Sequence, residues 1–236
     1  MERTAGYEGT AGPLDDLLLF AGASMARDGS ASHYGSTFGE IAVCLRAVGL
    51  ADRHELCTLE LRGSAGALDE ATSLVTGRQP PVGVAVRGAR AWWVRVSEHR
   101  LLLVCEPEVR RGLGGRLDRL CSPRAGRSWS EVSGDYEALG LVGPDARAVL
   151  EATCPGCAEH MRSTGRFAGA RIGGAPCLVL REAEEQYLVL VPRGQAVEVW
   201  RTLEATGMGF HMAAVGRQAL DRFAVSRRTQ AHQARA

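Results

Sequence analysis

The sequence predicts an α+β fold, in which two related halves each combine mostly antiparallel strands with helices on one face of the sheet. Segments with strand-like alternation are interleaved with segments of helical periodicity along most of the 236 residues. A polar stretch rich in Ser, Pro and Gly, residues 122–131, interrupts this order near the middle. After it, a strand–glycine–helix unit appears a second time, roughly 80 residues after the first, as expected for an internal duplication.

The first half is expected over residues 14–130, after a loose N-terminal arm of residues 1–13. Apolar residues at Phe38, Ile41 and Leu45 recur with helical spacing, and a glycine, Gly49, is expected to end that helix. Alternation from Leu56 to Gly63 predicts a strand with one buried face. The same patterns predict helices at 14–23, 35–49, 65–75 and 106–120, and strands at 56–63, 82–87, 91–97 and 100–105.

The second half is expected over residues 131–225. Its first strand ends at Gly143-Pro144-Asp145, a turn sequence that leads into a helix. The patterns predict strands at 136–143, 165–172, 176–181 and 187–191, and helices at 146–153, at 195–205 and from residue 216 onward. The polar tail, residues 226–236, is expected to be flexible.

The composition excludes some classes of binding partner and indicates where in the cell the protein is found. The formal net charge is +1, so no global field attracts the protein to nucleic acid or to an anionic membrane. No apolar run approaches the roughly 18 residues that a membrane span requires. Two aspartates precede the apolar run at 17–20, where a secretory signal carries positive charge. The 7 cysteines are scattered and several lie in apolar runs, which is typical of reduced thiols. We therefore expect a cytoplasmic protein with no nucleic-acid or membrane partner.

Several short motifs, taken in order, resemble the glycine-cleavage T-protein family, the folate-binding aminomethyltransferases. The helix before Gly49, followed by Asp52 and a strand ending in Arg62-Gly63, is similar to the N-terminal block of that family. The turn at Gly143-Pro144-Asp145 resembles its "QGP-(N/D)-A" motif. The strand from Tyr187 to Pro192 and the later Gly216-Arg217 follow the order of its "GYE" and "G-A-R-D" elements.

The resemblance spans roughly residues 15–228 and implies two halves around a central cavity that holds tetrahydrofolate or a derivative. Full-length T-proteins carry an additional C-terminal barrel, which this chain is expected to lack. In size it is closest to the gamma subunit of heterotetrameric sarcosine oxidase. The resemblance therefore also implies flavoprotein oxidase subunits, or a second copy of the chain, as partners.

The sequence departs from the family at the positions that carry its chemistry. The catalytic Asp of the family lies in a "G-G-x-x-D-D" hairpin, but residues 87–93 contain no carboxylate. The Glu of "GYE", which binds the pterin ring, falls at Leu188, and the earlier "N-D" pair falls at Thr76-Gly77. Transfer of an aminomethyl carbon requires a group that stabilises developing positive charge. We therefore do not expect ordinary aminomethyl transfer.

The candidate folate-binding residues are those that match the family or stand near a lost position. Arg217 matches the Arg of the late helix, and Tyr187 matches the Tyr of "GYE". Glu184, a few residues away, is a candidate replacement for the lost carboxylate; a solvated turn is the alternative. Trp92 and Trp93 point to opposite faces of a strand, so one is a candidate to stack on a flat ligand. The alternative is that one ring packs in the core and the other is partly exposed.

The candidate catalytic residues are Asp52 and His54, a carboxylate–imidazole pair expected near the wall of the cavity. They are suited to act as orienting group and general base, against the alternative of a surface His beside a turn Asp. The motif Cys154-Pro155-Gly156-Cys157, with His160, has residue types that bind zinc or act in redox chemistry. No second Cys-x-x-Cys accompanies it, so a plain loop is favoured and no metal site is predicted.

Three functions remain open at this stage. The leading hypothesis is a diverged, folate-binding protein of one-carbon or amine metabolism. An enzyme similar to a one-carbon transferase is favoured over a non-catalytic protein. One alternative is a non-catalytic gamma-type subunit of a heteromeric sarcosine or amine oxidase. The other is a folate-independent enzyme that uses the same cavity for a different small molecule.

Overall fold

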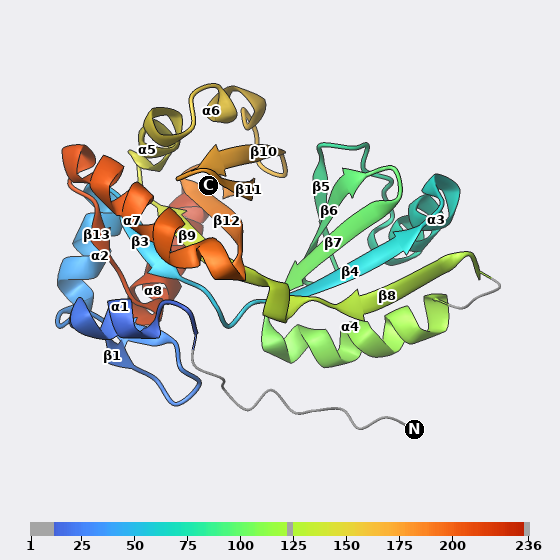
Figure 1. Cartoon of the computed structure of the whole chain (residues 1–236), viewed down its shortest axis with the longest axis horizontal. Coiled ribbons are helices and arrows are strands. Elements are labelled where there is room, and N and C mark those ends of the chain that lie inside the picture. The colour runs from blue at the N-terminus through green and yellow to red at the C-terminus, as the bar shows by residue number, and fades with distance from the viewer. Residues whose placement is uncertain (1–11, 122–124, 234–236) are drawn as a thin grey trace.

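Two β-sheets lie against each other, with helices on their outer faces (Figure 1). The computed structural model describes residues 12–121 and 125–233, with side chains up to residue 227 in the last helix. Within these residues, none of the helices combines the length and apolar composition that a membrane-spanning helix requires. The expected α+β fold with mostly antiparallel sheets is confirmed.

The larger sheet has six strands and is antiparallel except at one edge, where β13 runs parallel to β3. In spatial order its strands are β10 (Phe167–Ile172), β11 (Ala175–Ala183), β12 (Gln186–Pro192), β9 (Tyr136–Val142), β3 (Gly49–Asp52) and β13 (Ala213–Ala214). Three helices contribute to the core on its outer face, namely α1 (Asp15–Phe20), α5 (Ala146–Thr153) and α7 (Ala196–Gly207), and a short helix, α6 (Cys157–His160), follows α5. Trp200 of α7 and Tyr187 of β12 are the largest side chains buried there.

The smaller sheet has five antiparallel strands. In spatial order they are β5 (Ala85–Gly88), β6 (Ala91–Ser97), β7 (Arg100–Cys105), β4 (Cys57–Gly63) and β8 (Arg127–Glu131). Its outer face packs on α3 (Ala65–Thr76) and α4 (Pro107–Leu120), with Trp93 in the centre of that core. Ser64 caps α3 by accepting a hydrogen bond from Ala67 N, and Gly77 ends it in a left-handed conformation with a φ of 70°.

The two sheets have the same internal order, which supports the expected duplication. The run β4–α3–β5–β6–β7–α4 corresponds element by element to β9–α5–β10–β11–β12–α7. Strand β3 of the first half pairs with β9 of the second half, and β8, which reaches the boundary at residue 130, pairs with β4 of the first half. The larger sheet therefore includes a strand from the first half. The division at residue 130 separates the halves along the chain but does not separate the two sheets in space.

Between the sheets lies a third apolar cluster. Trp92 and Leu102 from the smaller sheet meet Phe167, Leu180 and Leu188 from the larger one. Along β12 the side chains alternate between this inner cluster and the outer core, as the pleat of a strand requires.

One end of the molecule is closed by helices and a hairpin. Helix α2 (Thr37–Arg46) packs on α8 (Arg217–Gln233), and the short strands β1 (Ser24–Met25) and β2 (Ala31–His33) lie beside them. The buried carboxylate of Glu40 holds this end together, because it accepts hydrogen bonds of 2.7 Å from both Tyr34 N and Gly216 N. Short 3-10 turns at 133–135, 193–195 and 208–210 complete the described structure.

Several expected elements differ from the structure. The helix expected at 35–49 ends at Arg46, and Gly49 begins strand β3, because residues 49–52 pair with β9. The polar stretch 122–131 contains strand β8, which pairs with β4. Helix α8 continues to Gln233, so the expected flexible tail is helical from 226 to 233. Most of the expected arm, residues 1–11, and residues 234–236 of the tail lie outside the described residues.

Candidate functional site

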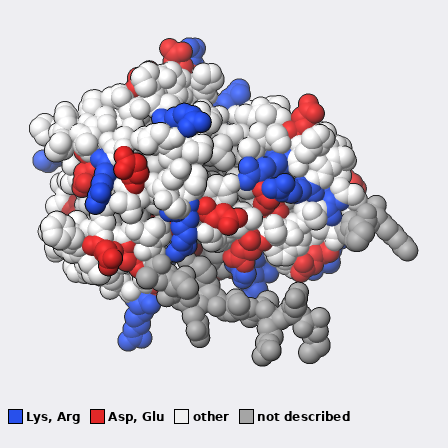
Figure 2. Space-filling view, in the orientation of Figure 1, with Lys and Arg blue, Asp and Glu red and all other residues white. Residues whose placement is uncertain are grey.

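A cavity of about 770 Å³ opens between the two sheets, beside helix α8. It lies within the range of about 300–1,000 Å³ that is usual for small-molecule sites. Its walls come from the β3–β4 linker, the end of β5, the start of α4, strands β9, β11 and β12, and helix α8. Its charged lining residues are Arg53, Glu55, Arg87, Glu106, Glu108, Glu182, Arg217, Asp221 and Arg227. Both signs are also interleaved on the face of the molecule shown in Figure 2.

Glu182 is the best-supported carboxylate of this cavity. Its Oε2 accepts a hydrogen bond of 2.8 Å from Arg53 Nη1, and its Oε1 accepts one of 3.1 Å from Trp92 Nε1. Arg53 comes from the linker between β3 and β4, whereas Trp92 comes from β6 of the smaller sheet. The three side chains therefore join both sheets at the cavity.

Arg53 is the centre of a small group of carboxylates. Besides Glu182, it lies 3.4 Å from Glu106 and 3.8 Å from Glu55. Burial alone would lower the pKa of Arg53, but the three carboxylates, Glu182 first, outweigh burial and raise it. Burial raises the pKa of Glu55, and Arg53 opposes that rise. The guanidinium is thus held charged beside Glu55, the carboxylate among the three that burial desolvates most strongly.

Arg217 lies at the rim of the same cavity, at the start of α8. Its Nη1 donates to Asp28 Oδ2 at 2.9 Å, and its side chain is 36% exposed. The hydrogen bond from the Ser30 hydroxyl is the largest cause that lowers the pKa of Asp28, and the charge of Arg217 lowers it further. The guanidinium therefore has a partner on one side and the cavity on the other.

The two tryptophans point to opposite faces of β6, as expected. Trp93 is fully buried in the core beneath α3 and α4, where its Nε1 donates to Gly88 O at 3.0 Å. Trp92 is 7% exposed in the inner cluster, and the Arg87 guanidinium lies 5.6 Å from its ring centroid. The structure therefore places Trp92, and not Trp93, next to the cavity residues.

Glu184 and Tyr187 are placed differently from each other. Glu184 is exposed in the turn between β11 and β12. Tyr187 contributes to the cavity wall, but its ring packs in the outer core, with the Arg181 guanidinium 5.8 Å from the ring centroid. The carboxylate that the structure brings to the cavity in this segment is Glu182.

Asp52 and His54 form the expected pair, on the opposite face of β3 from Arg53. His54 Nδ1 lies 2.7 Å from Asp52 Oδ2, and His54 N donates to Asp52 Oδ1 at 3.1 Å. Burial would lower the pKa of His54, but the hydrogen bond and the charge of Asp52 raise it to about 9. Glu137 lies on the adjacent strand β9, and one of its carboxylate oxygens is close to both Asp52 and His54. None of the three lines the cavity between the sheets.

The turn between β5 and β6 is the place where the family resemblance predicts a catalytic Asp. Ala89 and Arg90 both adopt left-handed conformations there, with φ of 49° and 60°, and form the two-residue turn of a tight hairpin. The neighbouring residue in the cavity wall is Arg87. The hairpin is therefore present with a cation where a carboxylate is expected.

Comparison with known proteins identifies the family. Residues 92–229 match the model described as the GCVT N-terminal domain, which is more than half of the chain. The chain belongs to this family. The expected relationship to the T-protein is thereby confirmed. A search of curated proteins finds no significant match.

Two solved structures share the fold of this GCVT N-terminal domain protein. The glycine cleavage system aminomethyltransferase T from Bartonella henselae has a TM-score of 0.69 and 18% identity, and the match covers 89% of this chain and 60% of that chain. A chain of the heterotetrameric sarcosine oxidase from Corynebacterium sp. U-96, in complex with pyrrole 2-carboxylate, has a TM-score of 0.61 and 22% identity, with 87% and 98% covered. At sequence identities of 18% and 22%, the structural similarity to these two proteins shows a shared fold and nothing further.

The Cys-x-x-Cys motif of this GCVT N-terminal domain protein borders a second cavity, of about 690 Å³. Cys154, Cys157, His160 and Cys177 all contribute to its wall. Burial raises the pKa of the Cys157 thiol to about 12 and that of Cys177 to about 11. The thiols of Cys157 and Cys177 are therefore poor nucleophiles at neutral pH. Among the described residues, Asp52, His54 and Glu137 are the only three or more potential metal ligands whose ligand atoms lie close together.

Glu182 and Glu137 were missed by the sequence patterns, although a signal for each was present. Glu182 continues the alternation of Leu178 and Leu180, which face the inner cluster. Glu137 likewise precedes Leu139 by two residues, on the face that packs in the outer core. A carboxylate in register with buried leucines is unusual and points to a function or a partner.

Proposed function

We propose that the cavity between the two sheets binds a reduced folate or a related pterin, and that the protein acts in one-carbon or amine metabolism. The proposal depends mainly on one observation, the Glu182 carboxylate held in the cavity by Arg53 and Trp92. A pterin ring presents an amide-like edge of donors and acceptors, and a carboxylate satisfies its donors. Leaving such an edge unpaired on burial costs about 1–3 kcal/mol.

The donors and acceptors of the cavity fit this ligand. Glu182 uses one acceptor position on each oxygen, and a carboxylate has about four lone-pair sites, so capacity for ligand N–H groups remains. Gln186 offers both a donor and an acceptor in the same wall. Arg87 and Arg217 supply positive charge that suits the carboxylates of a folate tail.

The proposal is for binding and not for aminomethyl transfer. The β5–β6 turn presents Arg87 and Arg90 in place of the family's carboxylate. A guanidinium repels the cationic amine that forms when an aminomethyl carbon is transferred. A reaction of this protein on a folate-bound carbon therefore requires chemistry different from that of the T-protein.

Ligand binding is best measured by tryptophan fluorescence, since Trp92 donates to the carboxylate that the pterin would contact. Tetrahydrofolate is expected to quench the emission, and Glu182→Gln is expected to weaken binding at least tenfold. Glu184→Gln is the matched control, because it makes the same chemical change two residues away on an exposed side chain. Unchanged affinity in Glu182→Gln would contradict the proposed site.

Two further outcomes separate the other hypotheses. If tetrahydrofolate does not bind at high micromolar concentration, folate is excluded and a folate-independent use of the cavity gains support. Weakening in Glu184→Gln but not in Glu182→Gln would place the pterin at the turn between β11 and β12. Arg217→Met tests the rim, where loss of a guanidinium is expected to weaken binding of the polyglutamate tail more than that of the ring.

A second candidate function is a gamma-type subunit of an amine oxidase. The observation that favours it is the fold, because this chain matches a chain of the heterotetrameric sarcosine oxidase with a TM-score of 0.61 over 98% of that chain. Co-expression with flavoprotein amine oxidase subunits, followed by size-exclusion chromatography, tests this function. Co-elution at fixed stoichiometry supports it, and a stable monomer or homodimer in the presence of those subunits contradicts it.

A further inference from the structure

Glu137 is a buried carboxylate without a hydrogen-bond partner. It is 1% exposed, and both carboxylate oxygens lack a partner within the described structure. An isolated charged carboxylate is among the most costly groups to bury, so it is normally protonated, paired or bound to a cation. The groups around Glu137 distinguish these alternatives.

Two further metal-binding side chains lie next to Glu137. Asp52 at the end of β3, His54 in the linker that follows it and Glu137 on β9 each offer one ligand atom, and these three atoms lie within 4.8 Å of one another. The register of the strands brings them together, since Asp52 pairs with Leu139 and Arg53 N donates to Ala138 O at 2.8 Å. Two of the donors, Asp52 and Glu137, therefore sit on hydrogen-bonded strands, and His54 lies in the turn directly after β3.

We propose that Asp52, His54 and Glu137 bind one divalent transition-metal cation on the α1 side of the β3–β9 ladder. Bonds of about 2.0–2.2 Å to a tetrahedral ion separate its ligand atoms by roughly 3.4 Å. Small side-chain rotations from the observed spacing reach that separation. One imidazole nitrogen with two carboxylate oxygens is a donor set suited to Mn²⁺, Zn²⁺ or Fe²⁺.

The second nitrogen of His54 is already oriented for such a site. Its Nε2 lies 3.3 Å from Asp28 O in the turn between β1 and β2, while Nδ1 faces the two carboxylates. Metal-binding histidines almost always donate their other N–H to a carbonyl or carboxylate, which fixes the tautomer. A cation would replace the proton that Nδ1 now shares with Asp52, and Nε2–H would remain bonded to the carbonyl.

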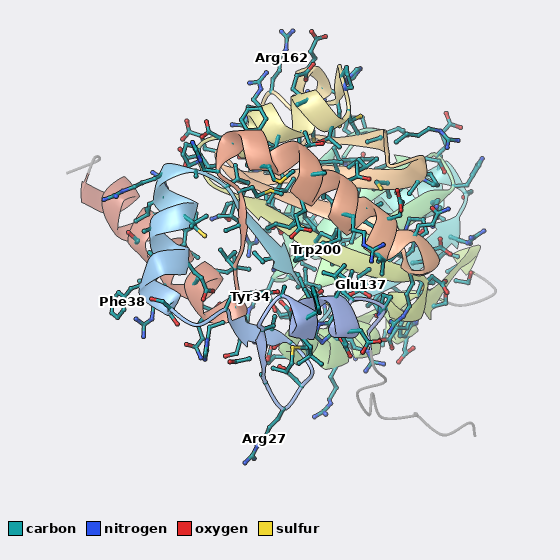
Figure 3. All side chains as sticks on the ribbon, turned by 60° about the vertical axis from the view of Figure 1, so that its left-hand side comes forward. Arg27, Tyr34, Phe38, Glu137, Arg162 and Trp200 are labelled. Atoms are coloured by element: carbon teal, nitrogen blue, oxygen red, sulfur yellow. The ribbon has the colours of Figure 1, made fainter. Side chains whose placement is uncertain are left out.

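Charge favours a cation at this place. Two carboxylates and a neutral imidazole balance a charge of +2, whereas without a metal the cluster places two carboxylates around a single imidazolium. Figure 3 shows Glu137 beside helix α1. Asp15 of that helix also acts electrostatically on Glu137, and so does the cation Arg193. The ion would thus neutralise buried charge where the chain leaves β3 to cross from one sheet to the other.

The Cys-rich second cavity supplies competing ligands, so the probe must distinguish oxygen and nitrogen from sulfur. Mn²⁺ prefers carboxylate and imidazole over thiolate. Metal-free protein, prepared with a chelator that is then removed, is titrated with Mn²⁺ while the electron paramagnetic resonance signal of the free ion is followed. We expect one Mn²⁺ per chain and a higher melting temperature on binding.

The ligands are tested with Glu137→Gln and His54→Gln, each expected to weaken Mn²⁺ binding more than tenfold. Glu184→Gln, an exposed carboxylate elsewhere, is expected to bind as the wild type does. Circular dichroism establishes that each variant is folded, and either variant alone is sufficient if the other does not fold. A Co²⁺ spectrum without thiolate charge-transfer bands is expected.

Three results would overturn the proposal. They are absence of Mn²⁺ and Zn²⁺ binding up to millimolar concentration, binding that survives both substitutions, and Co²⁺ thiolate bands that disappear in Cys157→Ser. The first result would show that Glu137 is held protonated. The third would assign metal binding to the cysteines of the second cavity.

Discussion

Trp92 on the smaller sheet donates its indole N–H to Glu182 on the larger sheet, at 3.1 Å and across 90 positions of sequence. The hydrogen bond joins the two halves at the mouth of the cavity, where Glu182 also pairs with Arg53. Because this hydrogen bond connects the two sheets, it contributes both to the assembly of the halves and to the shape of the site.

The energetic coupling between Trp92 and Glu182 can be measured by a double-mutant cycle. Trp92→Phe removes the donor and keeps most of the ring, so we expect the free energy of unfolding to fall by about 1–3 kcal/mol. Once Glu182→Gln is present, the further loss from Trp92→Phe should be smaller, with an interaction energy of about 0.5–3 kcal/mol. Urea unfolding of the four proteins gives this energy. Strict additivity would show that the hydrogen bond contributes nothing to stability.

Arg53→Met is expected to destabilise the protein and to loosen the cavity. The substitution leaves Glu182, Glu106 and Glu55 without their shared cation. Breaking a fully buried pair costs about 3–5 kcal/mol, and the partial exposure of these side chains reduces this to roughly 2–3 kcal/mol. Chemical denaturation measures the loss, with Arg201→Met on the exposed face of α7 as the control. Equal stability of the two variants would mean that the carboxylates are adequately solvated.

The stability of the metal-free protein is expected to fall as the pH rises from about 4.5 to 7. Burial raises the pKa of Glu137 from 4.5 to about 7, Asp52 and Asp15 raise it further, and His54 and Arg193 oppose the rise. An acid with a raised pKa in the folded state keeps its proton while the unfolded chain releases it, so the loss of stability begins near pH 4.5 and is complete near pH 7. One pKa unit corresponds to about 1.4 kcal/mol, so the loss amounts to a few kcal/mol.

Glu137→Gln isolates the contribution of that carboxyl group. The amide has nearly the same shape and does not titrate, so the variant should be more stable than the wild type above pH 7 and should lose this part of the pH dependence. Thermal unfolding in the presence of a chelator, at intervals from pH 4.5 to 8, measures the difference. Parallel curves for the two proteins would show that Glu137 is not desolvated in solution.

Gly216→Ala is expected to displace the start of α8. A Cβ atom at this position would lie 2.5 Å from His33 N and closer still to the carbonyl of Ser32, both backbone atoms of β2. Neither neighbour is the flexible end of a side chain, so the helix must move and the bond from Gly216 N to Glu40 must lengthen. We expect a loss of at least about 1–3 kcal/mol, the range for overpacking. Gly112→Ala, in α4 with open space around it, is the control.

The sequence by itself determined most of the elements and the family. Periodicity located the strand–helix units accurately, because strands such as β4 and helices such as α3 have clear patterns and a polar or glycine residue at their ends. Periodicity missed β3 and β8, because the formation of such short strands depends on pairing partners that are distant in the chain. It paired Asp52 with His54 because these residues are only two positions apart in the chain.

Only the tertiary structure decided which carboxylates matter. Glu182 meets Arg53 and Trp92, and Glu137 meets His54, through the register of strands from different halves. Glu184, two residues from Glu182, is exposed because β11 ends at Ala183 and Glu184 lies in the turn that follows. Within a strand, a shift of one residue in pairing moves every side chain to the opposite face. The local sequence determines which side chains alternate along a strand, but the partner strand determines which residues each face of that strand contacts.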